Sequence, residues 1–215
     1  MAYIKVVFIF FLSNILSPQT SGQAGTQVLY LTKKNGDTIK ISAQFLESNT
    51  DTVLIKVYQL KNRKLTPIQQ FRSLSSFPLE IKRTSFDNKN GISITYDPAV
   101  RWGNSYLYLF DEGNNSLREI KGFRELGSIS AVKSKNRSLH YSYISCGCAD
   151  NCWVSKLFEI KQFKLHIIAQ LRCDCSKLTA SHNKVSIPNS CKDFNDDQKF
   201  ERIAKHWAEA LRNGL

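Results

Sequence analysis

The chain has 215 residues, 42% of them hydrophobic, and a formal net charge of +12. This length suits one domain with its own core, and the charge is compatible with nucleic acid, an acidic envelope polymer or an acidic protein as partner. The alternative is a generally basic, solvated surface without a dedicated site for a polyanion. Nucleic acid is disfavoured because the Lys and Arg residues are dispersed and no helix-turn-helix, zinc-finger or RNA-stacking motif is present.

The first 24 residues have the pattern of a signal peptide. One positive charge, at Lys5, precedes an apolar run at residues 6–16. Small residues follow this run, and we expect cleavage after Ala24. A membrane anchor would need about 20 apolar residues, and Ser13 and Asn14 interrupt this run. We therefore expect a periplasmic or secreted protein with no membrane span after cleavage, and with a β-domain at residues 25–195.

Most of the remaining chain has the alternation of β-strands joined by tight turns. Asn35-Gly36 is the strongest hairpin signal, and the segment 87–91 is expected to form a second such turn. Strands are expected at 27–32, 38–45, 52–59, 64–70, 77–86, 92–96, 105–110, 117–120, 129–132 and 139–144, followed by a hairpin at 153–171.

One pattern occurs three times in these strands. An aromatic residue precedes a Leu by seven positions and an Ile by ten, and the aromatic residues are 52 and 48 positions apart. The copies are Tyr58/Leu65/Ile68, Phe110/Leu117/Ile120 and Phe158/Leu165/Ile168. A period near fifty, with one hairpin in each unit, is typical of sheets stacked around an axis. The sequence therefore predicts a mainly β, propeller-like assembly of antiparallel hairpins.

The C-terminal segment has a helical pattern instead. Phe200, Ile203, Trp207 and Leu211 recur at intervals of three and four, which predicts one amphipathic helix at residues 196–213. We expect this helix to pack on the sheets. Its acidic residues disfavour a role on a membrane surface.

Six cysteines lie after position 145, and an even number in an exported chain predicts disulfides. If residues 161–163 form a hairpin turn, Cys152 lies near Cys173 and Cys148 near Cys175, which leaves Cys146 for Cys191. A metal site is the alternative, but the spacing of the cysteines and the expected export disfavour it.

Two groups of residues are candidate binding sites. Asp87, Asn88 and Asn90 precede Gly91 as in oxygen-rich calcium loops, although Phe86 occupies an expected ligand position and a plain Asn-Gly turn explains the same residues. We expect no other cofactor.

The second group is a polar loop held by cysteines. Asp150, Asn151 and Trp153 are candidates for contact with a partner, the alternative being that Trp153 covers the core and Asp150 caps a turn.

Nothing in the sequence indicates a catalytic site. Four histidines, His140, His166, His182 and His206, are scattered, and the GxSxG and HExxH motifs are absent. His206 is expected on the surface of the helix. These observations favour a binding protein over an enzyme.

The acidic Asn-Gly turn, the strand at 104–110, the stretch 147–158 and the repeated hairpins together resemble a family of small periplasmic, propeller-like proteins related to FG-GAP or VCBS repeats. The resemblance covers about residues 52–175. Some members are immunity proteins that inhibit lysozyme-like toxins, and calcium seen in such folds carries over only to Asp87, Asn88 and Asn90.

The resemblance implies an exported, non-enzymatic binding protein that inhibits a cell-wall hydrolase, but it carries over no inhibitory residue. From the residues themselves we expect the cysteine-held loop at 150–153 to enter the cleft of the hydrolase. The partner would be a protein of the cell envelope. One alternative is an envelope protein that binds acidic polysaccharide or peptidoglycan through its basic surface, which avoids the repulsion between two basic proteins. The other alternative is a hydrolase whose site forms only on folding.

Overall fold

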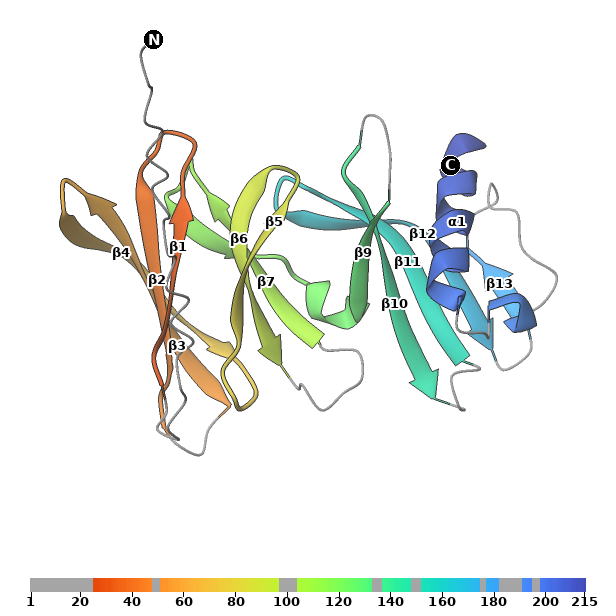
Figure 1. Ribbon diagram of the computed structural model, residues 1–215, viewed down its shortest axis with the longest axis horizontal. Helices are drawn as coiled ribbons and strands as arrows, with labels where there is room; N and C mark the ends of the chain where they lie inside the picture. The colour runs from red at the N-terminus through yellow and green to blue at the C-terminus, as the bar shows by residue number, and fades with distance from the viewer. Residues whose placement is uncertain are drawn as a thin grey trace, which may run out of the picture.

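The computed structural model describes residues 25–47, 51–96, 104–132, 137–147, 152–174, 177–181, 191–194 and 198–215. In these ranges three antiparallel sheets follow one another along the long axis of the molecule, and one α-helix lies beside the last sheet (Figure 1). The expected mainly β fold with a C-terminal helix is confirmed. No helix in this part of the chain has the length and apolar character needed to cross a membrane.

Each sheet is a meander in which strands adjacent in sequence are adjacent in space. Sheet A contains β1 (Gln27–Thr32), β2 (Thr38–Phe45), β3 (Thr52–Lys61) and β4 (Lys64–Leu74). Sheet B contains β5 (Ile81–Phe86), β6 (Lys89–Tyr96), β7 (Asn104–Asp111) and β8 (Ser116–Glu119). Sheet C contains β9 (Ser128–Val132), β10 (Leu139–Gly147), β11 (Cys152–Lys161), β12 (Lys164–Asp174) and β13 (Lys177–Ala180). The remaining elements are the short helices η1 (Phe123–Leu126) and η2 (Cys191–Phe194) and the helix α1 (Lys199–Arg212).

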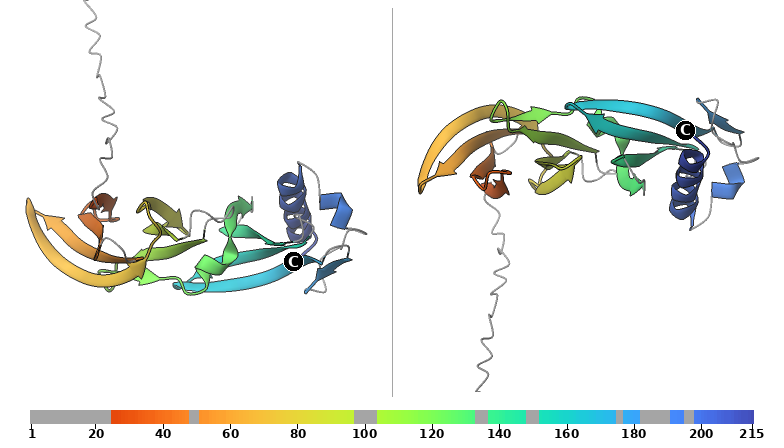
Figure 2. Two further views of the ribbon diagram at one scale, coloured as in Figure 1. Left: turned by 90° about the horizontal axis from the view of Figure 1, so that it is seen from below. Right: turned by 90° about the horizontal axis from the view of Figure 1, so that it is seen from above.

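A four-stranded meander is also the strand order of a propeller blade. Within the described ranges the three sheets close no ring, and Figure 2 shows the β3–β4 ribbon bowed at the end of the molecule opposite α1. The propeller-like arrangement therefore stays a prediction.

The turn between β5 and β6 is shorter than the sequence indicated. Asp87 and Asn88 both have positive φ and form a two-residue turn of the kind that matches strand twist. Gly91 lies inside β6, not in the turn, and a Cβ atom there would collide with the carbonyl oxygen of Tyr108 on β7. The glycine is thus required by the close approach of two strands.

All three copies of the repeated pattern form hairpins, one in each sheet. The first and third copies both have a two-residue turn. Both also contain a β-bulge, in which Ile68 and Ile168 are the extra residues opposite Val57-Tyr58 and Leu157-Phe158. The second copy pairs Phe110 directly with Leu117 across a longer turn. Equal sequence spacing therefore corresponds to equal geometry only in sheets A and C.

Three hydrophobic clusters join the elements in chain order. One lies between sheets A and B, one between sheets B and C, and one between sheet C and α1. Strand β7 is buried on both faces, since Tyr108 and Phe110 enter the first cluster while Leu107 and Leu109 enter the second. Sheet B is thus covered on both sides, whereas only one face of sheet A enters a cluster.

Two glutamine side chains also connect sheets A and B. The amide of Gln27 donates to the backbone carbonyl of Leu79 at 2.5 Å and accepts from the backbone N–H of Ile81 at 2.9 Å. Gln69 makes the same pair of bonds with the backbone of Leu117, at 3.0 and 2.8 Å. Each amide satisfies backbone groups at an edge strand of sheet B that would otherwise lack partners.

The helix α1 packs on sheet C, as its pattern predicted. Ile203, Trp207 and Ala210 are buried, and the indole Nε1 of Trp207 donates a hydrogen bond to the buried Ser155 Oγ at 2.9 Å. His206 is buried as well, beside Phe194 and Trp207, so the expectation of a surface histidine was wrong. The helix has a wider buried face because η2 covers it in addition to the sheet.

Candidate functional site

The expected binding loop at 150–153 is only partly described. Trp153 lies in β11, has no exposed surface and packs against Tyr143 and Phe194. It belongs to the core between sheet C and α1, so the expectation that Trp153 contacts a partner was wrong. Asp150 and Asn151 lie outside the described residues.

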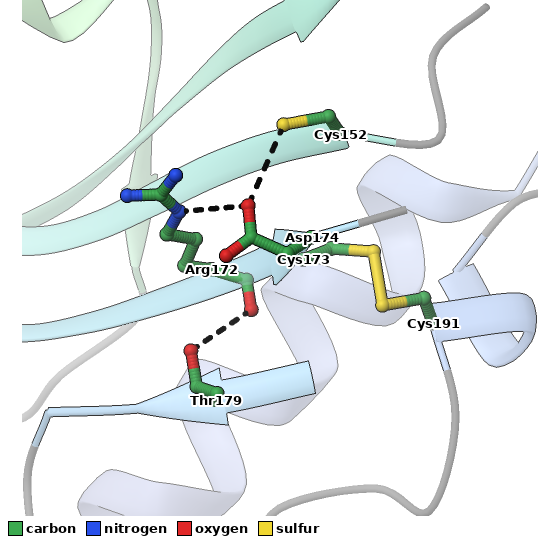
Figure 3. The surroundings of a disulfide bond; sticks show 6 residues. All are labelled: Cys152, Arg172, Cys173, Asp174, Thr179 and Cys191. Atoms are coloured by element: carbon green, nitrogen blue, oxygen red, sulfur yellow. Dashed lines mark hydrogen bonds and ion pairs between the residues drawn. A yellow bond between two sulfur atoms is a disulfide. The ribbon is translucent and has the colours of Figure 1, made fainter. Parts of the chain in front are cut away.

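The disulfide pattern differs from the expected one. Cys173 pairs with Cys191, with their Cα atoms 5.8 Å apart, so the expected pairs Cys152–Cys173 and Cys146–Cys191 were wrong (Figure 3). The bulge in the β11–β12 hairpin shifts the register, and Trp153, not Cys152, lies opposite Cys173. The expected pair Cys148–Cys175 lies outside the described residues.

The Cys173–Cys191 bond holds the end of β12 to η2, so Phe194 is held against Trp153 and His206. Cys152 is also disulfide-bonded, and its Sγ lies 3.9 Å from Asp174 Oδ1. A sulfur in a disulfide has no proton to donate, so this is a contact and not a hydrogen bond. The cysteines thus stabilise the C-terminal end of the fold.

The residues expected to bind calcium are near one another but not in one loop. Asp87 and Asn88 form the turn, whereas Asn90 lies in β6 and donates from its side-chain amide to the carbonyl of Thr32 at 2.9 Å. In the described ranges no three His, Cys, Asp or Glu side chains are grouped to hold a metal ion. Calcium at these residues stays a prediction.

His206 is buried and His140 is half-buried. Burial lowers the pKa of His140, which stacks between Phe86 and Phe158. Burial also lowers the pKa of His206, although the nearby Glu209 acts in the opposite direction. His166 is exposed on β12, and His182 lies outside the described residues.

A hollow of about 710 Å³ lies around the tip of the β11–β12 hairpin. Its lining includes Lys89, Arg118 and Lys161, which suggests an anion site at first sight. Each of these cations already has an acidic partner, since the distances to Asp87, Asp111 and Glu159 are 3.6, 3.2 and 3.0 Å respectively. The attraction for an external anion is therefore largely cancelled.

Two of these acids, Asp111 and Glu159, have a lowered pKa. Hydrogen bonds from Asn114, more than from Arg118, lower the pKa of Asp111 against the effect of burial. Burial would raise the pKa of Glu159, but hydrogen bonds from Arg137 and Lys161 outweigh it and the pKa is lowered. The balance of charge thus persists at neutral pH.

Sheet A has a different balance. Its four strands contain no Asp or Glu but five cations, Lys40, Lys56, Lys61, Lys64 and Arg72. Lys40, Lys56 and Arg72 form no ion pair within the described part of the chain. This is the largest block of uncompensated charge that the fold gathers on one sheet.

The pairing of the strands places three of these cations, Lys40, Lys56 and Arg72, on one face. Residues of β2 and β3 alternate between the core with sheet B and the opposite side, which we call the outer face of sheet A. One row across the strands is Tyr30, Lys40, Tyr58 and Pro67, and the next is Val28, Ser42, Lys56 and Gln70. Arg72 follows in the third row, opposite Leu54.

The outer face is open to solvent at its edge. Tyr30 is 44% exposed, and neither Tyr30 nor Tyr58 belongs to a hydrophobic cluster. Two tyrosine side chains with a lysine between them, on strands without acids, form a surface that combines stacking with attraction for anions. We take this surface as the candidate functional site.

The sequence contained a signal for this face that was missed. No acid occurs from residue 52 to residue 79, and five cations lie in that segment. Lys40 and Tyr30 join them only through the strand register, so the cations look dispersed when they are counted along the chain.

No protein-family model matches the chain, and no curated protein matches it either. Among solved structures, a Xanthomonas protein described as related to a Type IV secretion system resembles it with a TM-score of 0.43 and 16% identity. The likeness covers 75% of this chain and 90% of that one. A likeness of this strength carries no argument about function.

Proposed function

We propose that the chain is an exported, non-enzymatic binding protein that binds an acidic polysaccharide of the cell envelope on the outer face of sheet A. The observation that carries the proposal is a set of three cations without ion pairs, Lys40, Lys56 and Arg72, on the same face as the exposed Tyr30, in a sheet whose strands contain no acid.

Electrostatics favour this face over the hollow at the β11–β12 tip. An arriving anion meets three charges that no neighbour compensates, whereas in the hollow it would compete with three acids at salt-bridge distance. The same argument favours an acidic ligand over a neutral one.

The expected compartment supports an envelope ligand. The signal-peptide pattern at residues 1–24 predicts export, and a structural disulfide such as Cys173–Cys191 persists in oxidising compartments. A polysaccharide is the polyanion that such a protein would meet outside the cytoplasm.

The test is retention on immobilised uronic acid polymers, hyaluronan and polygalacturonate, as salt is raised. We expect retention that falls steeply with salt, because exposed charges are screened. The variant Lys40→Gln/Lys56→Gln/Arg72→Gln should bind roughly tenfold more weakly or worse. The control Lys121→Gln/Lys164→Gln/Lys205→Gln has the same net charge but lies elsewhere on the surface, and it should bind nearly as well as the wild type.

Equal losses in the two variants would show that only net charge matters and would contradict a dedicated face. Failure of the wild type to bind either polymer at low salt would reject the proposed function.

The inhibitor hypothesis depends on Asp150 and Asn151, which lie outside the described residues, so it remains a prediction of the sequence. The resemblance to propeller-like periplasmic proteins stays a proposal too, supported by the meander order of sheets A and B.

A further inference from the structure

The outer face of sheet A has one row in which side chains of two kinds alternate. Tyr30 on β1, Lys40 on β2 and Tyr58 on β3 lie opposite one another in the strand register. Adjacent strands are about 4.8 Å apart, so the backbones of Tyr30 and Tyr58 are roughly 9.6 Å apart, with the backbone of Lys40 between them. Pro67 ends the row on the edge strand β4.

The two kinds of side chain bind different parts of a polysaccharide. The flat face of a tyrosine ring packs against the apolar C–H face of a sugar ring, whereas an ammonium group attracts a carboxylate. One hexose residue of an extended chain is comparable in length with one strand spacing. A chain that runs across the strands therefore places three successive sugars over Tyr30, Lys40 and Tyr58.

We infer that the ligand is a polysaccharide in which neutral and acidic sugars alternate, and that it crosses the strands of sheet A along this row. This inference rests on the proposed function and specifies its ligand. Neutral sugars lie on the two tyrosines, and the acidic sugar between them meets Lys40. Lys56 lies in the next row, diagonal to Lys40, and Arg72 lies one row further on. Both attract the rest of the polysaccharide chain.

The distribution of charge within the row supports alternation. A polymer with an acid on every sugar would place carboxylates over both tyrosine rings, whose faces carry negative charge density and repel them. It would also leave two of its three charges without a cation in the row. The alternating polymer meets a ring where it is apolar and a cation where it is charged.

The experiment compares calorimetric titrations with two oligosaccharides of equal residue count. One is a hyaluronan oligosaccharide, in which glucuronic acid alternates with N-acetylglucosamine, and the other is an oligogalacturonate, acidic at every residue. We expect the alternating ligand to bind at least roughly tenfold more tightly at matched salt. Equal or tighter binding of the oligogalacturonate would overturn the inference and leave the proposed function standing, whereas no binding of either would reject both.

Single substitutions separate the stacking role of the tyrosines from the electrostatic role of Lys40. Tyr30→Ala, on an exposed edge strand, should weaken binding of the alternating ligand at every salt concentration without changing the salt dependence. Lys40→Gln should reduce the salt dependence itself. Phe77→Ala removes an aromatic residue that is 75% exposed but outside the row, and it should bind as the wild type does.

An identical response to Tyr30→Ala and Phe77→Ala would contradict the stacking role. Titration with oligothymidylate is a further arm. Tighter binding of this nucleic acid than of the alternating oligosaccharide would assign the rings to base stacking and overturn the inference.

Discussion

The β3–β4 and β11–β12 hairpins have the same construction but different surroundings. Their strands begin and end one hundred positions apart, both turn over two residues, and both carry a bulge at the equivalent isoleucine. In sheet C, Phe158 and Ile160 are 0% and 4% exposed because sheet B covers them. In sheet A the equivalent residues are Tyr58 and Leu60, and Leu65, which pairs with Leu60, is 43% exposed.

The neighbouring strand extends the comparison. Lys40 lies opposite Tyr58 in sheet A, and His140 lies opposite Phe158 in sheet C. The open position thus holds a cation beside a phenol, and the covered position holds a half-buried imidazole beside a phenyl ring. The β11–β12 hairpin contributes to the core because sheet B covers it. The outer face of the β3–β4 hairpin is covered by no sheet of the described chain, and it is the candidate binding face.

The largest difference in stability between the two hairpins is expected when the equivalent aromatic residue of each is replaced by alanine. Phe158→Ala should lower the free energy of unfolding by about 3–5 kcal/mol because it empties a fully buried site, whereas Tyr58→Ala, on the open face, should cost about 1 kcal/mol. Denaturant unfolding measures both values. Similar losses for the two variants would show that the outer face of sheet A is buried and would end the comparison.

The two hairpins also differ at their far ends, where only β12 is held by a disulfide to a later segment. The variant Cys173→Ser/Cys191→Ser should lose about 3 kcal/mol, since the bond closes a loop of 18 residues. A binding assay on the same variant supplies the control. Its affinity for the acidic polymer should be unchanged, because the disulfide lies in sheet C and not in sheet A. A parallel loss of binding in the folded variant would place the site near the disulfide instead.

A smaller effect on the free energy of unfolding is expected from His140 as the pH falls. Burial lowers the pKa of His140 below its ordinary value of 6.5, so the unfolded chain takes up a proton that the folded chain resists. The free energy of unfolding should therefore be constant well above pH 6.5 and should fall as the pH drops below it. Burial also lowers the pKa of His206, so this residue adds to the same dependence on pH.

The variant His140→Gln should flatten this dependence in part, and thermal unfolding between pH 8 and pH 5 measures it. A Lys40→Gln variant is the matched control and should leave the slope unchanged. An unaltered slope in His140→Gln would mean that the imidazole is solvated in the folded state.

The sequence was sufficient where the determinants are local. Asn35-Gly36 predicted both flanking strands with their observed bounds, and the spacing of Ile203 and Trp207 predicted α1. Local patterns succeed because the turn or the helical face contains its own signal.

The errors came from features that depend on distant residues. The bulge at Ile168 shifted the register and with it the cysteine pairing, and η2 buried His206 from outside the helix. The candidate face was missed for the same reason, because Tyr30, Lys40 and Tyr58 become neighbours only through strand pairing.

The most direct measurement is to map the ligand on the protein by amide chemical shifts in a titration with the hyaluronan oligosaccharide. We expect the largest shifts on β1, β2 and β3, centred on Tyr30, Lys40 and Tyr58. Shifts centred on Asp150 and Asn151, or on the hollow around the β11–β12 tip, would contradict the assignment of the binding face to sheet A.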